Sequence, residues 1–294
     1  MNQPYSSVST SHSGPPCTDG DSFEPVESIH GREGSRLLFL CDHASNRLPA
    51  QYGTLGLEPG QFERHIAWDI GAADVTRELA RHFQAPAILA RFSRLLIDPN
   101  RGDDDPTLVM RISDGAIIPG NVVAGPEETD RRRKLYWQPY RDAGTAAIDA
   151  MLQAGCIPAI VSIHSYTDRW KGRLRPWEIG LMWDSDPRLA ARLHTQLSLD
   201  PNLCIGDNEP YGTLVGDVLY QHAMLRGLPH VLIEIRQDLI ATPAGARQWA
   251  ERIAAPLAAS LDEDIFKVKY YRTRAGSGHR IMLNDHEALR QYEL

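Results

Sequence analysis

Three stretches of the chain consist mainly of consecutive apolar residues and show no regular alternation with polar ones. They are Leu37–Cys41, Pro158–Ile163 and Pro229–Ile235, the last of which is interrupted by Glu234. A strand that faces water on one side alternates, whereas a strand covered on both faces does not. The pattern therefore predicts three strands buried within a sheet. Shorter apolar segments predict further strands after Pro86, up to about Ile97, and around residues 181–183.

Apolar residues recur at helical spacing between these strands. Within residues 61–83 the repeat is formed by Ile70, Ala73, Val75, Leu79 and Phe83. Four more helices are predicted: Glu127–Gln153 with Pro139 as a kink or break, one that begins near Asp184 or Ser185, residues 218–228 with Gly227 near the C-terminal end, and Ala244–Leu261. Residues 102–126 contain the turn sequences GDDDP, SDG, IPG and AGP, which predict a loop.

Buried strands that alternate with helices predict an α/β fold: a single-domain three-layer sandwich with a mixed, mostly parallel sheet and helices on both faces. We expect one domain over residues 26–294. Residues 1–25 are rich in Ser, Gly, Pro and Thr and predict a disordered N-terminal tail. In open α/β sheets the functional site gathers outside the C-terminal ends of the strands. Polar residues that follow the buried strands are therefore the first candidates for chemistry.

Charge and cysteine content narrow the class of partner. The formal net charge is −7, which disfavours nucleic acid or an anionic membrane as the main partner. A small anionic substrate stays possible, because local arginines can bind it in an acidic protein. The four cysteines form no CxxC pair, and the chain has no signal-peptide pattern and no apolar run of about 18 residues. We therefore expect a cytoplasmic protein with reduced thiols.

Two histidines follow buried strands, His43 in CDHASN and His164 in IHSYTD. Imidazoles held on rigid strand ends suit a catalytic zinc ion, which binds three protein ligands and keeps one position open. Each ligand histidine needs an acceptor for its other ring N–H, and Asp42, Asp69 or Asp168 could supply one. The alternative is that both are hydrogen-bonded structural histidines.

An acidic residue, Glu234, stands among Leu232, Ile233 and Ile235. A buried carboxylate is costly without a partner or a role, and burial raises its pKa toward the range of a general base. The alternative is a structural ion pair with Arg236, which an extended strand places on the same face.

A basic cluster lies in RFSRLLIDPNR, where Arg94, Asp98, Asn100 and Arg101 crowd around one expected strand end. An arginine fork matches a carboxylate, so the cluster could bind an acidic substrate. The alternative is a solvated loop with surface ion pairs.

Taken in order, the motifs CDHASNRLP, HIAWDIGA, RFSRLLIDPNR, IHSYTD, NEPYG and IEIRQDL resemble the N-formylglutamate amidohydrolase family. The resemblance runs from about Leu37 to Ala258. It implies a fold similar to that of the zinc carboxypeptidases. It also implies a small anionic N-acyl amino acid as the substrate, with hydrolysis of N-formyl-L-glutamate to formate and glutamate in histidine breakdown.

The resemblance also implies roles for individual residues. His43 and His164 match the two metal histidines, and Glu234 matches the catalytic glutamate. The related HxxE motif reads His43-Ala44-Ser45-Asn46 here, so Asn46 stands at the position of the third ligand, with Asp69 as the alternative. Five residues are expected around the substrate: Arg94 at the oxyanion, Asn100 and Arg101 at the carboxylate with help from Arg236, and Tyr166 closing over the substrate.

The mechanism that these assignments predict is hydrolysis by a zinc-polarised water, with Glu234 moving its proton to the leaving amine. The alternatives are a deacylase or carboxypeptidase for other small acyl-amino-acid substrates, and a ligand-binding relative without catalysis. A cysteine hydrolase that uses Cys41 beside His43 is a third alternative, and it is disfavoured relative to the metal site.

Overall fold

The computed structural model describes residues 23–211, 216–273, 282–284 and 290–291. The expected tail, residues 1–25, lies outside the described residues except for its last three. Within the described part of the chain, seven strands form one sheet in the order β1-β3-β2-β6-β11-β9-β10. Their bounds are Val26–Ile29 (β1), Leu37–Cys41 (β2), Ala87–Ala90 (β3), Ala159–Tyr166 (β6), Ile179–Met182 (β9), Ile205–Asp207 (β10) and His230–Arg236 (β11).

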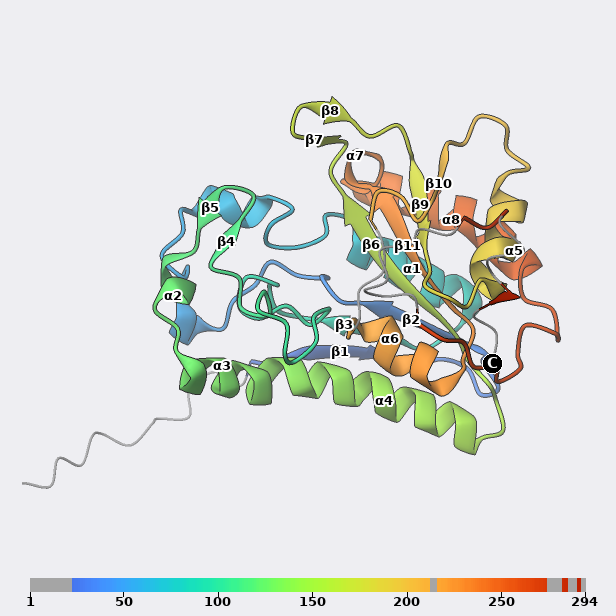
Figure 1. The fold of residues 1–294 in the computed structure, drawn as a ribbon, viewed down its shortest axis with the longest axis horizontal. Coiled ribbons are helices and arrows are strands. Elements are labelled where there is room, and N and C mark those ends of the chain that lie inside the picture. The colour runs from blue at the N-terminus through green and yellow to red at the C-terminus, as the bar shows by residue number, and fades with distance from the viewer. Residues whose placement is uncertain (1–22, 212–215, 274–281, 285–289, 292–294) are drawn as a thin grey trace, which may run out of the picture.

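The sheet is mixed and mostly parallel, as the sequence predicts. β3, β2, β6 and β11 run parallel, and β10 runs parallel to β9. β1 is antiparallel to β3, and β9 is antiparallel to β11. Two small hairpins extend from this frame (Figure 1): β4–β5, Ile112–Ser113 and Ala116–Ile117, and β7–β8, Arg169–Trp170 and Arg173–Leu174.

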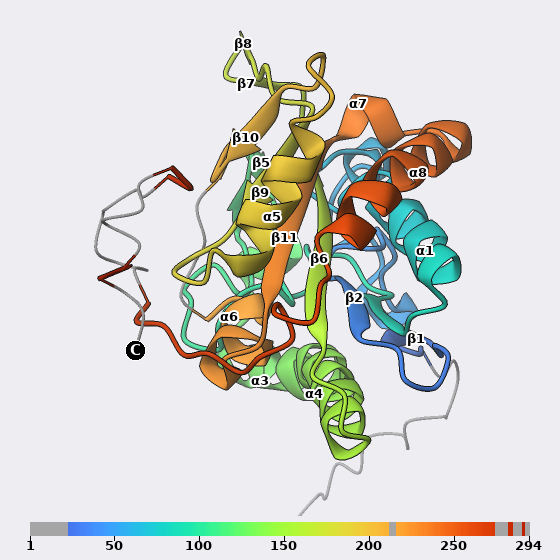
Figure 2. The same cartoon turned by 90° about the vertical axis from the view of Figure 1, so that its right-hand side faces the viewer.

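Helices cover both faces of the sheet. Their bounds are Ala72–Phe83 (α1), Pro119–Val122 (α2), Pro126–Arg132 (α3), Gln138–Gln153 (α4), Arg188–Leu197 (α5), Val218–His222 (α6), Gln237–Ile240 (α7) and Pro243–Ala259 (α8). Apolar residues of α1, α5 and α8 pack in one cluster, and those of α4 and α6 pack in another. Figure 2 shows these two layers on either side of the strands. The molecule is therefore a three-layer α/β sandwich.

Strand β2 shows why the sequence lacks alternation. Leu37, Phe39 and Cys41 join the cluster with α1, whereas Leu38 and Leu40 join the cluster with α4. Side chains still alternate between faces, but both faces are apolar because both are covered. None of the helices in the described ranges is long and apolar enough to cross a membrane.

Several predicted elements differ from the structure. The helix predicted over residues 218–228 is α6 only up to His222, and a separate 3-10 turn, Met224–Arg226, follows it. Residues 91–97 form turns rather than a strand, although Leu95, Leu96 and Ile97 are fully buried. The helix predicted within residues 61–83 begins only at Ala72, after Gly71 with a φ of 81°, a conformation that favours glycine. The N-cap of α5 is Pro187, with Asp186 accepting from the backbone of Arg188, rather than Asp184 or Ser185.

The predicted long helix around Pro139 is continuous but irregular. α3 passes into a π-helical turn, Arg133–Trp137, and α4 follows directly with Pro139 as its second residue. Proline lacks a backbone N–H and its ring clashes with the carbonyl four residues earlier. The wider π turn just before it removes the regular hydrogen bond that proline could not make.

Candidate active site

The candidate site lies at the C-terminal ends of the parallel strands. His43 follows β2 by two residues, and His164 lies near the end of β6. Glu234 of β11 stands directly opposite His164 in the parallel register. Asp69 comes from the turn that precedes α1, and its backbone N–H donates to the His43 carbonyl over 2.9 Å. Four separate parts of the chain therefore meet at one edge of the sheet.

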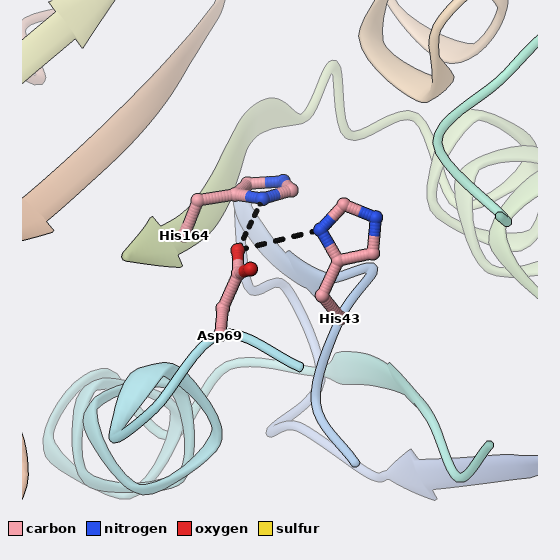
Figure 3. Close-up of side chains that lie close together, drawn as sticks. All are labelled: His43, Asp69 and His164. Atoms are coloured by element: carbon pink, nitrogen blue, oxygen red, sulfur yellow. Dashed lines mark hydrogen bonds and ion pairs between the residues drawn. The ribbon is translucent and has the colours of Figure 1, made fainter. Parts of the chain in front are cut away.

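His43, Asp69 and His164 form a buried cluster whose ligand atoms all lie within 4.8 Å of one another (Figure 3). The Nδ1 atom of His164 lies 2.8 Å from Asp69 Oδ2, and the Nδ1 atom of His43 lies 3.3 Å from the same oxygen. The exposed fraction of each residue is 2 or 3%. The two histidines thus lie on the same side of the sheet and close enough to share one ion, as the sequence predicts.

The Nε2 atom of each ring, the outer nitrogen that faces away from Asp69, contacts a second carboxylate. His164 Nε2 lies 2.7 Å from Asp42 Oδ2, and His43 Nε2 lies 2.7 Å from Asp98 Oδ1. Asp42 was among the acceptors expected from the sequence. Asp168 is not one of these contacts, because it is half-exposed and pairs with Arg169 at 3.8 Å.

Mutual charge sets the protonation of this cluster. Burial alone would lower the pKa of His164, but hydrogen bonds to Asp42 and Asp69 raise it well above its ordinary value. Burial alone would raise the pKa of Asp69, but the charges and hydrogen bonds of the two histidines lower it. The cluster therefore favours a carboxylate together with positive charge at its centre.

Glu234 provides a different kind of carboxylate. Its exposed fraction is 7%, and its Oε2 atom has no hydrogen-bond partner among the described residues. Burial raises its pKa to about 7. The alternative of an ion pair with Arg236 does not match the structure, in which Arg236 Nε donates to Asp238 Oδ1 over 2.8 Å. An unpaired carboxyl with this pKa beside two histidines suits proton transfer.

The two candidates for the third ligand lie in different surroundings. Asn46 directs its amide nitrogen to the carbonyl of Phe62, 2.9 Å away, and does not line the cavity described below. Asp69 lies between both histidines (Figure 3). The structure thus brings together His43, His164 and Asp69.

A cavity of about 460 Å³ opens from the cluster. Its charged and polar lining includes the three cluster residues, Glu234, Arg94, Asn100, Arg101, Asp217, Asp114, Ser113, Ser165 and His65, and its apolar and aromatic lining includes Ile66, Met110, Met182, Leu232, Tyr166, Trp170 and Tyr211. Pockets of this size, partly apolar with a few converging polar groups, are typical of small-molecule sites.

The expected substrate residues differ in what they present to this cavity. Arg94 is held by Asp98 at 2.8 Å and Asp69 at 3.5 Å. The side-chain oxygen of Asn100 accepts from the backbone N–H of Val218, so the amide nitrogen of Asn100 points away from Val218. Arg101 lines the cavity, and its buried Nε has no hydrogen-bond partner in the part of the chain that the structure describes. These three residues remain placed to bind an anion.

Tyr166 and Arg236 are placed less favourably. Tyr166 lines the cavity, but its exposed fraction is 1% and its hydroxyl donates to the carbonyl of Trp177. Arg236 is not part of the lining and is paired with Asp238. Tyr166 can therefore form a wall of the cavity rather than close over it.

Sequence reasoning missed His65 and Tyr211 as cavity residues and left Asp98 without a role. His65 opens the HIAWD motif four residues before Asp69, and burial lowers its pKa. Tyr211 belongs to the NEPYG motif and contacts Arg175 through its hydroxyl at 3.1 Å. Both motifs were visible in the sequence, but only the fold shows which of their side chains face the cavity.

The donor set fits a divalent metal ion. Two imidazoles and one carboxylate are the ligands of many catalytic zinc sites, which keep a fourth position open. The three residues face a cavity rather than a closed core, and the unpaired Oε2 of Glu234 lies at the same site. The surrounding carboxylates also favour added positive charge.

The chain is similar to known proteins over most of its length. A family model described as N-formylglutamate amidohydrolase matches residues 35–241. The solved structure of a gene product from Agrobacterium tumefaciens is 34% identical, covers 81% of this chain and 95% of its own, and has a TM-score of 0.78. The N-formylglutamate amidohydrolase from Ralstonia eutropha is 20% identical, covers 80% and 97%, and shares the fold with a TM-score of 0.59. No curated protein matches the chain. The chain belongs to the N-formylglutamate amidohydrolase family.

Proposed function

We propose that this protein is a metal-dependent amidohydrolase that cleaves the amide bond of a small anionic N-acyl amino acid, with N-formyl-L-glutamate as the first substrate to test. The observation that carries the proposal is the buried cluster of His43, Asp69 and His164, which faces a cavity beside the unpaired carboxyl of Glu234. The family match and the name of the Ralstonia eutropha relative support the choice of substrate.

The three cluster residues would hold one divalent ion, and the ligand types favour zinc. When bound, such an ion supplies a Lewis acid for the scissile carbonyl and lowers the pKa of a water molecule to roughly 7. Asp42 and Asp98 contact the outer nitrogens of the two histidines. Each of the three ligand side chains is therefore buried and held by hydrogen bonds.

Glu234 acts as the general base and then as the general acid. It takes a proton from the water that attacks the acyl carbon. It delivers that proton to the amine nitrogen as the C–N bond breaks, so the amine leaves as a neutral group. A pKa of about 7 suits both directions of transfer at neutral pH. The products are a carboxylic acid and a free amino acid.

Three residues bind the substrate and its developing charge. Arg101 and Asn100 hold the substrate carboxylate, since both line the cavity. Arg94 stabilises the tetrahedral oxyanion, and its ion pairs with Asp98 and Asp69 fix its position beforehand. Tyr166 forms part of the cavity wall.

The test is a hydrolysis assay on full-length protein, metal-free or reloaded with one equivalent of zinc. We expect zinc-dependent release of formate from N-formyl-L-glutamate. N-acetyl-L-glutamate, N-formyl-L-leucine and a glutamyl dipeptide separate a preference for the acyl group from one for the side chain. Absence of hydrolysis across this panel in zinc-loaded protein would contradict the proposal and favour a non-catalytic relative.

A cysteine-based mechanism is tested in the same assay. Cys41 is fully buried and its thiol pKa is raised well above its ordinary value, chiefly by burial. Its side chain belongs to the core cluster with α1 rather than to the cavity lining. Cys41→Ala should therefore retain the zinc-dependent activity per folded molecule.

A further inference from the structure

A hydrogen-bonded group behind His164 lies outside the substrate cavity. Asp42 Oδ2 accepts from Ser162 Oγ at 3.1 Å and lies 2.7 Å from His164 Nε2. Asp42 Oδ1 accepts from the hydroxyl of Tyr140 at 2.6 Å. Asp42, Ser162 and Tyr140 are each at most 1% exposed, and none of them lines the cavity. Substrate therefore does not touch this group.

The direction of these hydrogen bonds is fixed by chemistry. Both oxygens of Asp42 accept from hydroxyl groups, Oδ1 from Tyr140 and Oδ2 from Ser162, so this carboxylate is the acceptor in its contacts. His164 must therefore carry its proton on Nε2 in order to contact Asp42. The opposite nitrogen, Nδ1, lies 2.8 Å from Asp69 Oδ2 and donates to it when no ion is present. A bound ion would replace that proton on Nδ1, because Nε2 keeps its proton for Asp42.

We propose that Asp42, itself oriented by Tyr140 and Ser162, is a positioning residue that fixes the ring orientation and tautomer of His164 and so presents its Nδ1 atom to the metal. This inference rests on the proposed metal-dependent function. Tyr140 comes from α4 and Ser162 from β6, so two elements hold one carboxylate. Asp42 in turn couples the metal site to the packing of α4 on the sheet.

Two variants and one control distinguish an effect on the position of the His164 ring from a general effect on the stability of the fold. Asp42→Asn keeps the shape but lets an amide N–H face His164 Nε2, which favours the wrong tautomer. Tyr140→Phe removes only one hydroxyl. Tyr136→Phe is the matched control: it is also buried, and its hydroxyl bonds Gln51 at 2.8 Å rather than Asp42.

The first readout is zinc affinity, measured by competition with a chelator. We expect Asp42→Asn to weaken zinc binding by about 10- to 100-fold, the usual effect of losing an outer partner of a metal ligand. Tyr140→Phe should weaken it less but in the same direction, and Tyr136→Phe should leave it unchanged. If Asp42→Asn does not fold, the comparison of Tyr140→Phe with Tyr136→Phe decides alone.

The second readout is the ¹⁵N spectrum of the histidine rings, recorded with and without zinc. We expect a protonated Nε2 for His164 in wild type, with the Nε2–H signal shifted or lost in Asp42→Asn. Wild-type zinc affinity and an unchanged His164 signal in folded Asp42→Asn and Tyr140→Phe would overturn the inference. Failure of the wild type to bind zinc would instead contradict the proposed function. The two failures can be distinguished, because the Nε2–H signal of His164 can be measured in metal-free protein.

Discussion

Replacing Glu234 by glutamine tests the proposed reaction most directly. The substitution keeps the shape of the side chain and removes its ability to accept a proton from water. Because Oε2 has no hydrogen-bond partner among the described residues, no other described group loses a partner through the change. We expect the turnover number to fall by about 10²–10⁴, the usual contribution of a positioned acid–base group.

The same substitution should not destabilise the protein. The pKa of Glu234 is raised from 4.5 to about 7, so the folded state binds a proton more tightly than the unfolded chain. Stability is therefore lost as the pH rises from 4.5 through 7, and at pH 8 the ionised carboxylate costs the metal-free protein up to about 3 kcal/mol. Glutamine carries no charge, so the variant should be at least as stable as the wild type at this pH.

The assay combines urea denaturation, zinc content and turnover on one preparation. Glu178→Gln is the matched control, since Glu178 bonds the backbone of Cys204 and does not line the cavity. We expect the control to keep wild-type turnover. A folded, zinc-loaded Glu234→Gln protein with near wild-type turnover would refute the assignment of the base. A stability loss of about 3–5 kcal/mol, with turnover unchanged, would indicate a structural ion pair instead.

Three further predictions concern the ligands, the substrate and acid stability. Asp69→Asn should lower zinc content after dialysis, whereas Asn46→Ala should keep zinc and lose about 1 kcal/mol from its hydrogen bond to Phe62; the reverse zinc contents would make Asn46 the ligand. Arg101→Leu should raise KM by about 10- to 100-fold through loss of a charge-assisted hydrogen bond, and an unchanged KM would remove Arg101 from the carboxylate site. His222 is buried with its pKa lowered to about 4, so the unfolded chain binds its proton first and the fold loses about 3 kcal/mol as the pH falls from 6.5 to 4. In His222→Gln, the free energy of unfolding measured by urea denaturation should change less between pH 6.5 and 4 than in the wild type. An unchanged dependence on pH would contradict the role of His222 in acid stability.

The sequence by itself determined the layers of the fold. Unbroken apolar runs such as Leu37–Cys41 can only be buried on both faces, so the strands had to lie inside a covered sheet. Helical spacing of apolar residues located α1 and α8, because period and length are local properties of the chain. The same reasoning placed His43 and His164 at the ends of parallel strands, where neighbouring strand ends must meet.

Local reasoning failed where tertiary contacts decided the conformation. Leu95, Leu96 and Ile97 are apolar enough for a strand, but they are fully buried without belonging to one. Their backbone groups bond to distant segments, such as Leu96 O with Arg132 and Leu95 O with Asn121. A period-two pattern cannot be read from so few residues, and no local signal shows which remote donors will satisfy their carbonyls.

The composition of the site was decided by the tertiary structure. Asn46 and Asp69 were both open as the third ligand, because sequence spacing does not say which side chain reaches the histidines; the fold turns Asn46 to Phe62 and brings Asp69 between the rings. Arg236 lies two residues from Glu234, yet it pairs with Asp238. Side-chain direction depends on the packing of several elements at once, so residue type and spacing nominate a site, and only the folded chain shows which of its members meet.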